Sequence, residues 1–153
     1  MNDKHTHPRF SNDIVHILEK SGWFPERNVE NLLKLPDDFV IFPAALKVLK
    51  EFGLLHFGER GPGIECARTS INCDPMLADG ESELFREYSE QLHRKLYPIG
   101  EAHDGYYFLA IDESGTIFLL MDDLRFVHTH FEGAVENLLT GIDSLPVNDK
   151  GNW

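Results

Sequence analysis

A pair of histidines is the first feature of this chain that could support chemistry. His128 and His130 are separated by one residue in a segment expected to be a strand, so their side chains share one face. Two imidazoles at this spacing can bind zinc or nickel. A third ligand would have to come from elsewhere in the chain, and His103, Asp122 or Cys66 could supply it. A small metal-dependent enzyme or metal binder is therefore one hypothesis, and a pair of surface histidines is the other.

Nucleophilic catalysis has no support in the sequence. There is no Gly-x-Ser-x-Gly motif, and Ser114 lies in a segment typical of a turn. Cys66 and Cys73 lie in or beside an expected strand, where cysteine usually acts as a small buried hydrophobe. The glycine-rich stretch 58–63 lacks the Gly-Lys-Ser/Thr ending of a phosphate-binding loop and is interpreted as a flexible connection. We therefore predict no catalytic residue, no bound metal and no cofactor, and a protein that is not an enzyme.

Acidic residues dominate the charge of the chain. Its 26 aspartates and glutamates exceed its 14 lysines and arginines, which leaves a net charge of −12. Residues 1–60 hold nine acidic and eight basic residues (net −1), whereas residues 61–153 hold 17 and six (net −11). Such a field repels nucleic-acid phosphates and anionic lipids and accelerates association with a basic protein. We predict no binding to nucleic acid or membrane, and solubility alone is the alternative reason for the charge.

Eight carboxylates are candidates for contact with a basic partner. Three of them lie on the polar side of an expected helix, and the others lie at expected strand ends and turns, where binding residues are common. On the helix, Arg86 and Arg94 could each pair with a glutamate at a spacing of four residues, so a solvated face with weak ion pairs is the alternative interpretation. The candidates are Glu83, Glu87, Glu90, Asp104, Asp112, Glu113, Asp122 and Asp123.

Helices are expected where apolar residues recur at a spacing of three and four. Ser11 is a suitable N-cap for the first helix, and Gly22, Gly53 and Gly141 are suitable stop signals. A short helical turn is expected over residues 29–35. The four longer apolar stripes span residues 14–18, 45–52, 84–96 and 131–139.

Strands are expected between these helices. Residues 106–111 and 116–121 are apolar runs joined by Asp-Glu-Ser-Gly at 112–115, which predicts a β-hairpin. The first of these runs is apolar on both faces, as in a central strand covered on both sides. Further strands are expected at 54–57, 64–71 (broken) and 125–129. With 153 residues, this order predicts an α+β fold, a single domain with a largely antiparallel sheet and helices packed around it.

The remaining expectations concern the ends of the chain and its compartment. Residues 1–9 and 145–153 are expected to be flexible termini. The start of the chain lacks the apolar core of a secretory signal, and no window approaches 18 consecutive apolar residues. Two cysteines cannot form a disulfide framework, which indicates a reducing compartment. A cytoplasmic location is predicted.

Several short stretches in a set order carry a family resemblance. They are residues 22–27, 43–45, 49–54, 74–75, 97–101, 111–118 and 134–141. Their order resembles that of the SUKH superfamily, and specifically its third immunity-protein group. The resemblance spans residues 10–142.

The resemblance implies an α+β immunity domain that acts as an intracellular antidote in bacterial polymorphic toxin systems. Such a protein binds a cognate toxin domain, often a nuclease, and blocks it. The resemblance and the charge agree on a basic, nuclease-type toxin as the partner. A housekeeping protein-interaction module on the same fold is the alternative, and the oligomeric state is left open.

Much of the matched pattern is expected to be structural. Trp23 and Phe52 are expected to anchor the core. Pro25 and Gly53 are expected to set turns, and Arg27 is expected to be a partner in a buried ion pair. The resemblance therefore implies a fold and a role without assigning a toxin-binding surface.

Overall fold

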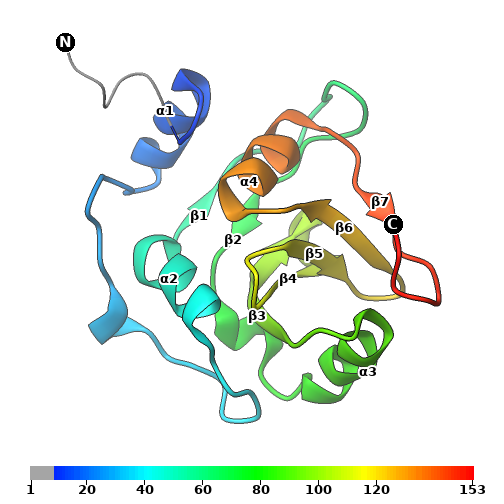
Figure 1. Ribbon diagram of the computed structural model, residues 1–153. Helices are drawn as coiled ribbons and strands as arrows, with labels where there is room; N and C mark the ends of the chain where they lie inside the picture. Colours follow the sequence, from blue (N-terminus) through cyan, green and yellow to red (C-terminus); the bar gives the residue numbers. More distant parts are fainter. Residues whose placement is uncertain (1–8) are drawn as a thin grey trace.

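A seven-stranded antiparallel sheet forms the centre of the structure, a computed structural model that describes residues 9–153. Its strands follow one another in chain order, so each strand pairs with the next (Figure 1). The strands are β1 (His56–Phe57), β2 (Ile71–Asn72), β3 (Leu96–Ala102), β4 (Tyr107–Asp112), β5 (Ile117–Leu120), β6 (Leu124–His128) and β7 (Leu145–Pro146). The helices are α1 (Asn12–Lys20), α2 (Pro43–Phe52), α3 (Ser82–Leu92) and α4 (Phe131–Thr140), with short 3-10 turns η2 (Glu30–Leu32), η3 (Pro75–Ala78) and η4 (His103–Gly105). The predicted single-domain α+β fold with an antiparallel sheet is confirmed.

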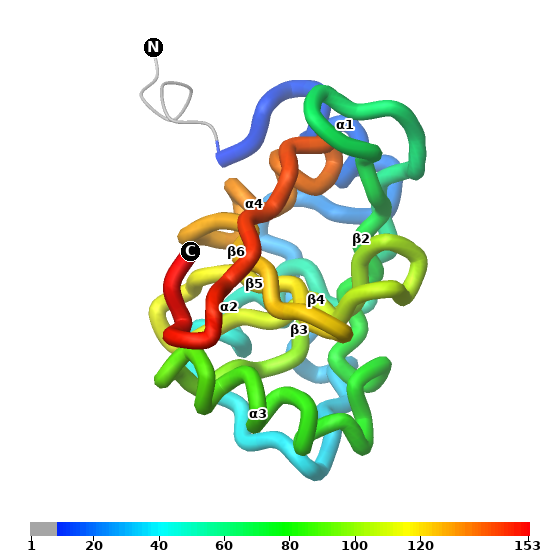
Figure 2. The backbone as a smooth tube through the Cα atoms, turned by 90° about the vertical axis from the view of Figure 1, so that its right-hand side faces the viewer, coloured from blue at the N-terminus to red at the C-terminus, as the bar shows by residue number. Residues whose placement is uncertain are grey.

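The two faces of the sheet are covered by different helices. Leu109 and Ile111 of β4 point into a core shared with α1, α2 and α4. Phe108 and Ala110 of the same strand point into a second core, which contains the apolar side of α3. Figure 2 shows α3 on one side of strands β3 to β5 and α1 and α4 on the other. Because the side chains of a strand alternate, β4 is apolar on both faces, as the sequence predicts.

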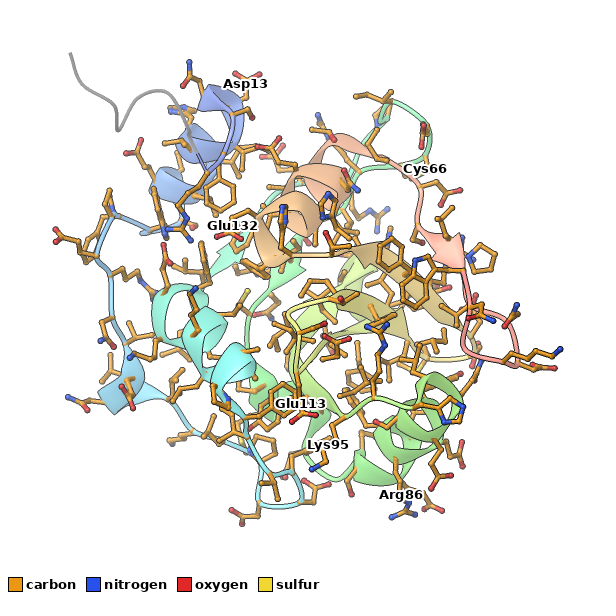
Figure 3. The ribbon with its side chains drawn as sticks, in the orientation of Figure 1. Asp13, Cys66, Arg86, Lys95, Glu113 and Glu132 are labelled. Carbon is orange, nitrogen blue, oxygen red and sulfur yellow. The ribbon has the colours of Figure 1, made fainter. Side chains whose placement is uncertain are left out.

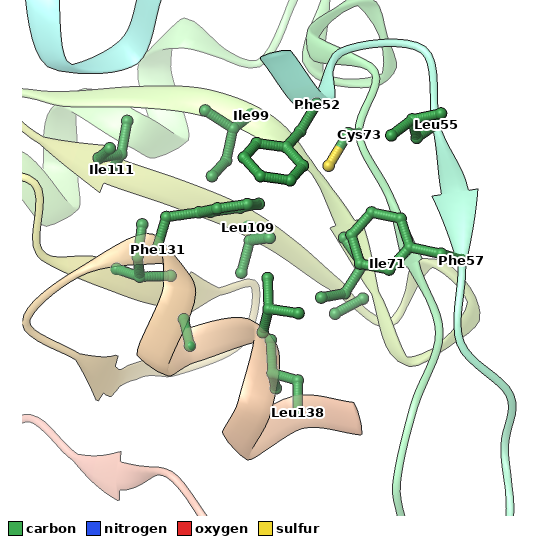
Figure 4. Close-up of a cluster of buried hydrophobic side chains, with 14 of the residues drawn as sticks. Phe52, Leu55, Phe57, Ile71, Cys73, Ile99, Leu109, Ile111, Phe131 and Leu138 are labelled. Carbon is green, nitrogen blue, oxygen red and sulfur yellow. The ribbon is translucent and has the colours of Figure 1, made fainter. Parts of the chain in front are cut away.

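The larger core is built around aromatic side chains. The ring of Phe52 on α2 lies 4.8 Å from that of Phe131 on α4, between centroids (Figure 4). Trp23 stacks parallel to Phe52 at 6.4 Å, and Phe10 meets both rings edge-on. Trp23 and Phe52 are buried, and the indole N–H of Trp23 donates to Glu51 at 2.9 Å. These rings join the segment before α1, the segment after it, and helices α2 and α4.

Arg27 differs from its expected role. Pro25 lies in a turn that the Arg27 N–H closes by donating to the Phe24 carbonyl at 3.2 Å. The Arg27 guanidinium then donates to the backbone carbonyl of Glu51 in the last turn of α2, and burial lowers its pKa. The expected buried ion pair is therefore replaced by a hydrogen bond to a carbonyl that the helix end leaves without an intrahelical partner.

Gly53 is required by the close approach of two segments. It follows the last residue of α2, and its N–H donates to the Leu49 carbonyl at 2.9 Å. A Cβ at this position would lie 2.5 Å from the Leu49 oxygen and 2.7 Å from the Leu33 side chain. Any larger residue would displace the backbone or the neighbouring side chain.

Two expected elements are wrong in extent. The apolar stripe 84–96 predicted one helix, but α3 ends at Leu92, His93 adopts a left-handed conformation, and Leu96 begins β3. Strand β3 was not predicted because Pro98 and Gly100 interrupt its pattern, and they coincide with a shift in register against β4. The broken strand 64–71 is reduced to β2, because only its last residue joins the ladder.

The C-terminal segment is packed rather than flexible. Leu145 and Pro146 pair with β6. The ring of Trp153 stacks on Phe126 at 4.6 Å, and the Arg94 guanidinium lies 5.3 Å from the centre of the same ring. Apolar stacking and a cation–π contact hold this segment on the sheet, which corrects the expectation for residues 145–153.

The N-terminal expectation lies mostly outside the described residues, since these begin at Arg9. Arg9 pairs with Glu51 and Glu132, each at 2.8 Å. Ser11 is the N-cap of α1, but its hydroxyl donates to Glu136 at 3.2 Å instead of capping the helix. Both contacts tie the start of the described chain to α2 and α4.

Asp112 is buried, which corrects its prediction as a partner-binding residue. Its carboxylate accepts hydrogen bonds from the N–H groups of Ser114 and Thr116, both at 2.9 Å, and pairs with Arg94 at 2.7 Å. Its exposed fraction is 1 %. The sequence placed Asp112 in an exposed turn, but the side chain folds back under the turn and closes it.

We predict that Asp112→Ala lowers the free energy of unfolding by about 3 kcal/mol, because it leaves turn donors unpaired and removes the partner of Arg94. Urea unfolding followed by circular dichroism measures the change. Glu113→Ala, at the neighbouring exposed position, is the matched control and should stay within about 0.5 kcal/mol of wild type. Equal stability of the two variants would show that the Asp112 network does not hold the hairpin.

Candidate partner-binding surface

Five of the predicted partner-binding carboxylates gather on α3 and the turn between β5 and β6. Glu83, Glu87 and Glu90 are exposed, and at about 100° per residue they occupy an arc of roughly 60° on the outer side of α3. Asp122 and Asp123 are exposed in the turn that follows β5. We call these five residues the acidic surface.

Tyr88 joins the two parts of the acidic surface. Its hydroxyl donates to the Met121 carbonyl at 2.9 Å, so it reaches from α3 to the turn. Burial raises the pKa of Tyr88, and the negative charges of Asp123, Asp122 and Glu87 raise it further. Three carboxylates from two elements therefore lie close enough to act on one hydroxyl.

Few basic groups offset these charges. Arg86 lies 4.0 Å from Glu83, which is a weak exposed contact. The expected pairs of Glu90 with Arg86 and Arg94 are not among the ion pairs of residues 9–153. Arg86 lies near Glu83 instead, and Arg94 pairs with the buried Asp112. Asp123 accepts a hydrogen bond from the Tyr107 hydroxyl at 2.8 Å and contacts Arg125 at 3.3 Å.

The other candidates lie apart from the acidic surface. Asp104 lies in η4 and pairs with Arg60 at 2.7 Å. Glu113 is exposed at the tip of the β4–β5 hairpin, and Figure 3 labels it in the same part of the molecule as Lys95. The register that pairs Leu96 with Asp112 places Lys95 and Glu113 at adjacent positions beyond the strand ends.

Tyrosine hydroxyls are the part of this surface that sequence reasoning missed. Tyr88 was taken only as a member of an apolar stripe, and Tyr107 only as a strand residue. The available signal was the choice of tyrosine over phenylalanine at the edge of an apolar face, since a buried tyrosine body usually brings its hydroxyl to a polar partner.

The histidine pair serves the start of α4. The rings of His128 and His130 stack with centroids 4.4 Å apart. His130 Nδ1 accepts a hydrogen bond from the Gly133 N–H at 3.0 Å, which caps the helix. Across residues 9–153, no group of three or more histidine, cysteine, aspartate or glutamate side chains could hold a metal ion. The proposed third ligands His103, Asp122 and Cys66 therefore do not complete a site with the pair.

Two histidines are shifted towards their neutral form. Burial lowers the pKa of His128, and the neighbouring His130 lowers it further. Burial also lowers the pKa of His103. At a pH below the ordinary histidine pKa of 6.5, each of these side chains binds fewer protons in the folded chain than in the unfolded chain. Protonation of these histidines therefore favours the unfolded chain.

We predict that the free energy of unfolding decreases as the pH falls below about 6.5 and approaches the lowered pKa values of these histidines. The contribution is complete above pH 6.5 because both states are then neutral. Urea unfolding at pH 7.5 and about 5.5 measures the difference. His128→Gln should reduce this difference, whereas His16→Gln, at an exposed position on α1, should not. An unchanged difference in the His128 variant would contradict the prediction.

The fold and the site define a class: an acidic α+β domain that carries a group of exposed carboxylates on one helix and the neighbouring turn. No helix within residues 9–153 is both long enough and apolar enough to cross a membrane. The model of the SUKH-3 immunity protein family matches residues 10–141. The chain belongs to this family, which supports an immunity function and the binding of a cognate toxin. The comparisons with curated proteins and with solved structures find no match.

Proposed function

We propose that this chain is a bacterial, cytoplasmic immunity protein that neutralises a basic, nuclease-type toxin domain of a polymorphic toxin system. It acts by binding and not by catalysis. Family membership supports the immunity role. The acidic surface, where carboxylates from α3 and the β5–β6 turn act on one tyrosine hydroxyl, is the observation that supports a basic partner.

Inhibition follows from covering the toxin. The carboxylates of the acidic surface compete with substrate phosphates for the basic groove of a nuclease, or occupy a site beside it. A standard interface buries roughly 1,600 Å² and shields such a groove from a nucleic acid. Exposed charges at an interface mainly accelerate association, whereas buried contacts slow dissociation. The acidic surface therefore steers the encounter.

The contacts of the histidine pair do not favour the metal-dependent alternative. His130 already uses Nδ1 to accept from the Gly133 N–H, and the backbone N–H of His130 points to Nδ1 of His128 at 3.4 Å. The histidine pair thus has a structural use at the start of α4. No observation in the fold favours a housekeeping interaction module over the immunity role.

We predict that the association rate with a nuclease-type toxin domain encoded beside the gene for this chain falls steeply as salt rises from about 50 to 500 mM. The double variant Glu87→Gln/Asp122→Asn should associate about 5-fold more slowly at low salt, and the difference should vanish at high salt. Surface plasmon resonance with a catalytically inactivated toxin measures both rates.

The matched control is Asp13→Asn/Glu19→Gln, which makes the same charge change at exposed positions of α1. Figure 3 shows Asp13 far from Arg86 on α3. The control should associate at nearly the wild-type rate. A salt-independent association rate would contradict electrostatic steering, and no binding to this toxin would contradict the proposed function.

A further inference from the structure

A groove of about 870 Å³ opens between the loop 60–68 and the turn η4. Arg60, Arg68, Asp104 and Tyr106 contribute to its lining. The groove lies next to the acidic surface: the ring of His103, another lining residue, is 5.9 Å from that of Tyr107, whose hydroxyl binds Asp123. One partner of ordinary size can therefore contact both.

The loop 60–68 is anchored to the end of α4. The N–H groups of Ile64, Glu65 and Cys66 donate to the carbonyls of Thr140 and Gly141 at 2.8–3.0 Å. These carbonyls lie where a helix end leaves acceptors without intrahelical partners, so the loop supplies the missing donors. The sequence suggested that the glycine-rich stretch 58–63 is a flexible connection. In the structure this stretch leads into a loop that is held by backbone hydrogen bonds (upper right in Figure 3, at Cys66).

The opposite side of the groove is a strained turn. His103 and Asp104 both have left-handed backbone conformations, with φ of 53° and 54°. Such a conformation is unfavourable for residues with a Cβ and persists where other contacts impose it. Two contacts hold this turn: Arg60 of the loop pairs with Asp104 at 2.7 Å, and the hydroxyl of Thr69, directly after the loop, accepts from the His103 N–H at 2.6 Å.

This arrangement holds two large side chains in solvent. Tyr106, directly after η4, is 77 % exposed, and Ile64, between two lining residues of the groove, is 75 % exposed. Because the backbone that carries them is already anchored, binding a partner does not have to order it. Tyrosine is also among the residues that most often dominate binding energy.

Arg68 in the groove lacks an acceptor. Its Nε is buried without a hydrogen-bond partner, and no carboxylate of residues 9–153 forms an ion pair with it. The guanidinium packs on Gly61, where a Cβ would lie 2.9 Å from Nε. The terminal guanidinium nitrogens of Arg68 are not among the buried unpaired atoms and form no ion pair within the described residues. They, and not the buried Nε, are the donors that a carboxylate from a partner could contact.

We propose that this groove binds a loop of the toxin that presents an aspartate or glutamate to Arg68 and an apolar side chain to Tyr106 and Ile64. This inference rests on the proposed function and adds the contact that holds the complex together. The acidic surface then sets how fast the toxin arrives, and the groove sets how slowly it leaves.

The test measures both rate constants of the inactivated toxin with single variants. Tyr106→Ala and Arg68→Met should each raise the dissociation rate at least 10-fold and change the association rate less than 2-fold. Leu32→Ala and Val40→Ala, which truncate apolar side chains that are 67 % and 90 % exposed elsewhere on the surface, are the controls and should leave dissociation unchanged. Urea midpoints identify any variant that is unfolded.

The outcomes separate the two proposals. If wild type binds the toxin and the Tyr106 and Arg68 variants dissociate as slowly as wild type, the groove is not the holding contact and the immunity function stands. If wild type does not bind the toxin, the proposed function fails and the groove assignment fails with it. If Arg68→Met is unfolded, Tyr106→Ala decides, because its ring lies in solvent.

Discussion

The structure depends on burying the central strands of one sheet on both faces. Strands β4 and β5 are buried along almost their entire length, and their side chains alternate between two separate cores. Each core needs its own cover, because a sheet face of this kind is unstable in water. Helices α1, α2 and α4 supply one cover and α3 supplies the other. Because both faces of the sheet are covered, the exposed surface consists mainly of the outer sides of these helices and the turns at the strand ends.

The negative surface follows partly from where the basic residues are used. Arg9, Arg94 and Arg125 each pair with carboxylates that tie separate segments together, and Arg27 binds a backbone carbonyl of α2. These contacts use four of the 14 basic residues for cohesion. The exposed acids of α3 and the β5–β6 turn are left with little compensation, which gives a surface suited to a basic partner.

In the proposed complex, steering and holding belong to neighbouring but different parts of the molecule. The acidic surface consists of exposed charges that salt screens, whereas the groove is built from anchored backbone, exposed apolar side chains and one unpaired arginine. An immunity protein needs both properties, since it must reach the toxin quickly and remain bound to it. Under this proposal, exposed charges that accelerate association lie beside a groove that slows dissociation.

Sequence periodicity predicted the hairpin, the helices α1, α2 and α4 and the two-faced strand β4, because these depend on local spacing. The family was indicated separately, by the resemblance of several short stretches in their order along the chain. Periodicity failed at β3, at Leu96 and at the C-terminal segment, where pairing across the sheet or the stacking of Trp153 on Phe126 overrides local preference. The surplus of carboxylates was evident from composition. The position of each charged group was not evident from composition. The fold buries Asp112, pairs Asp104 with Arg60 and places Arg68 in a groove. Only tertiary structure decides such matters, because charge partners far apart in the chain meet only when the sheet and its loops are assembled.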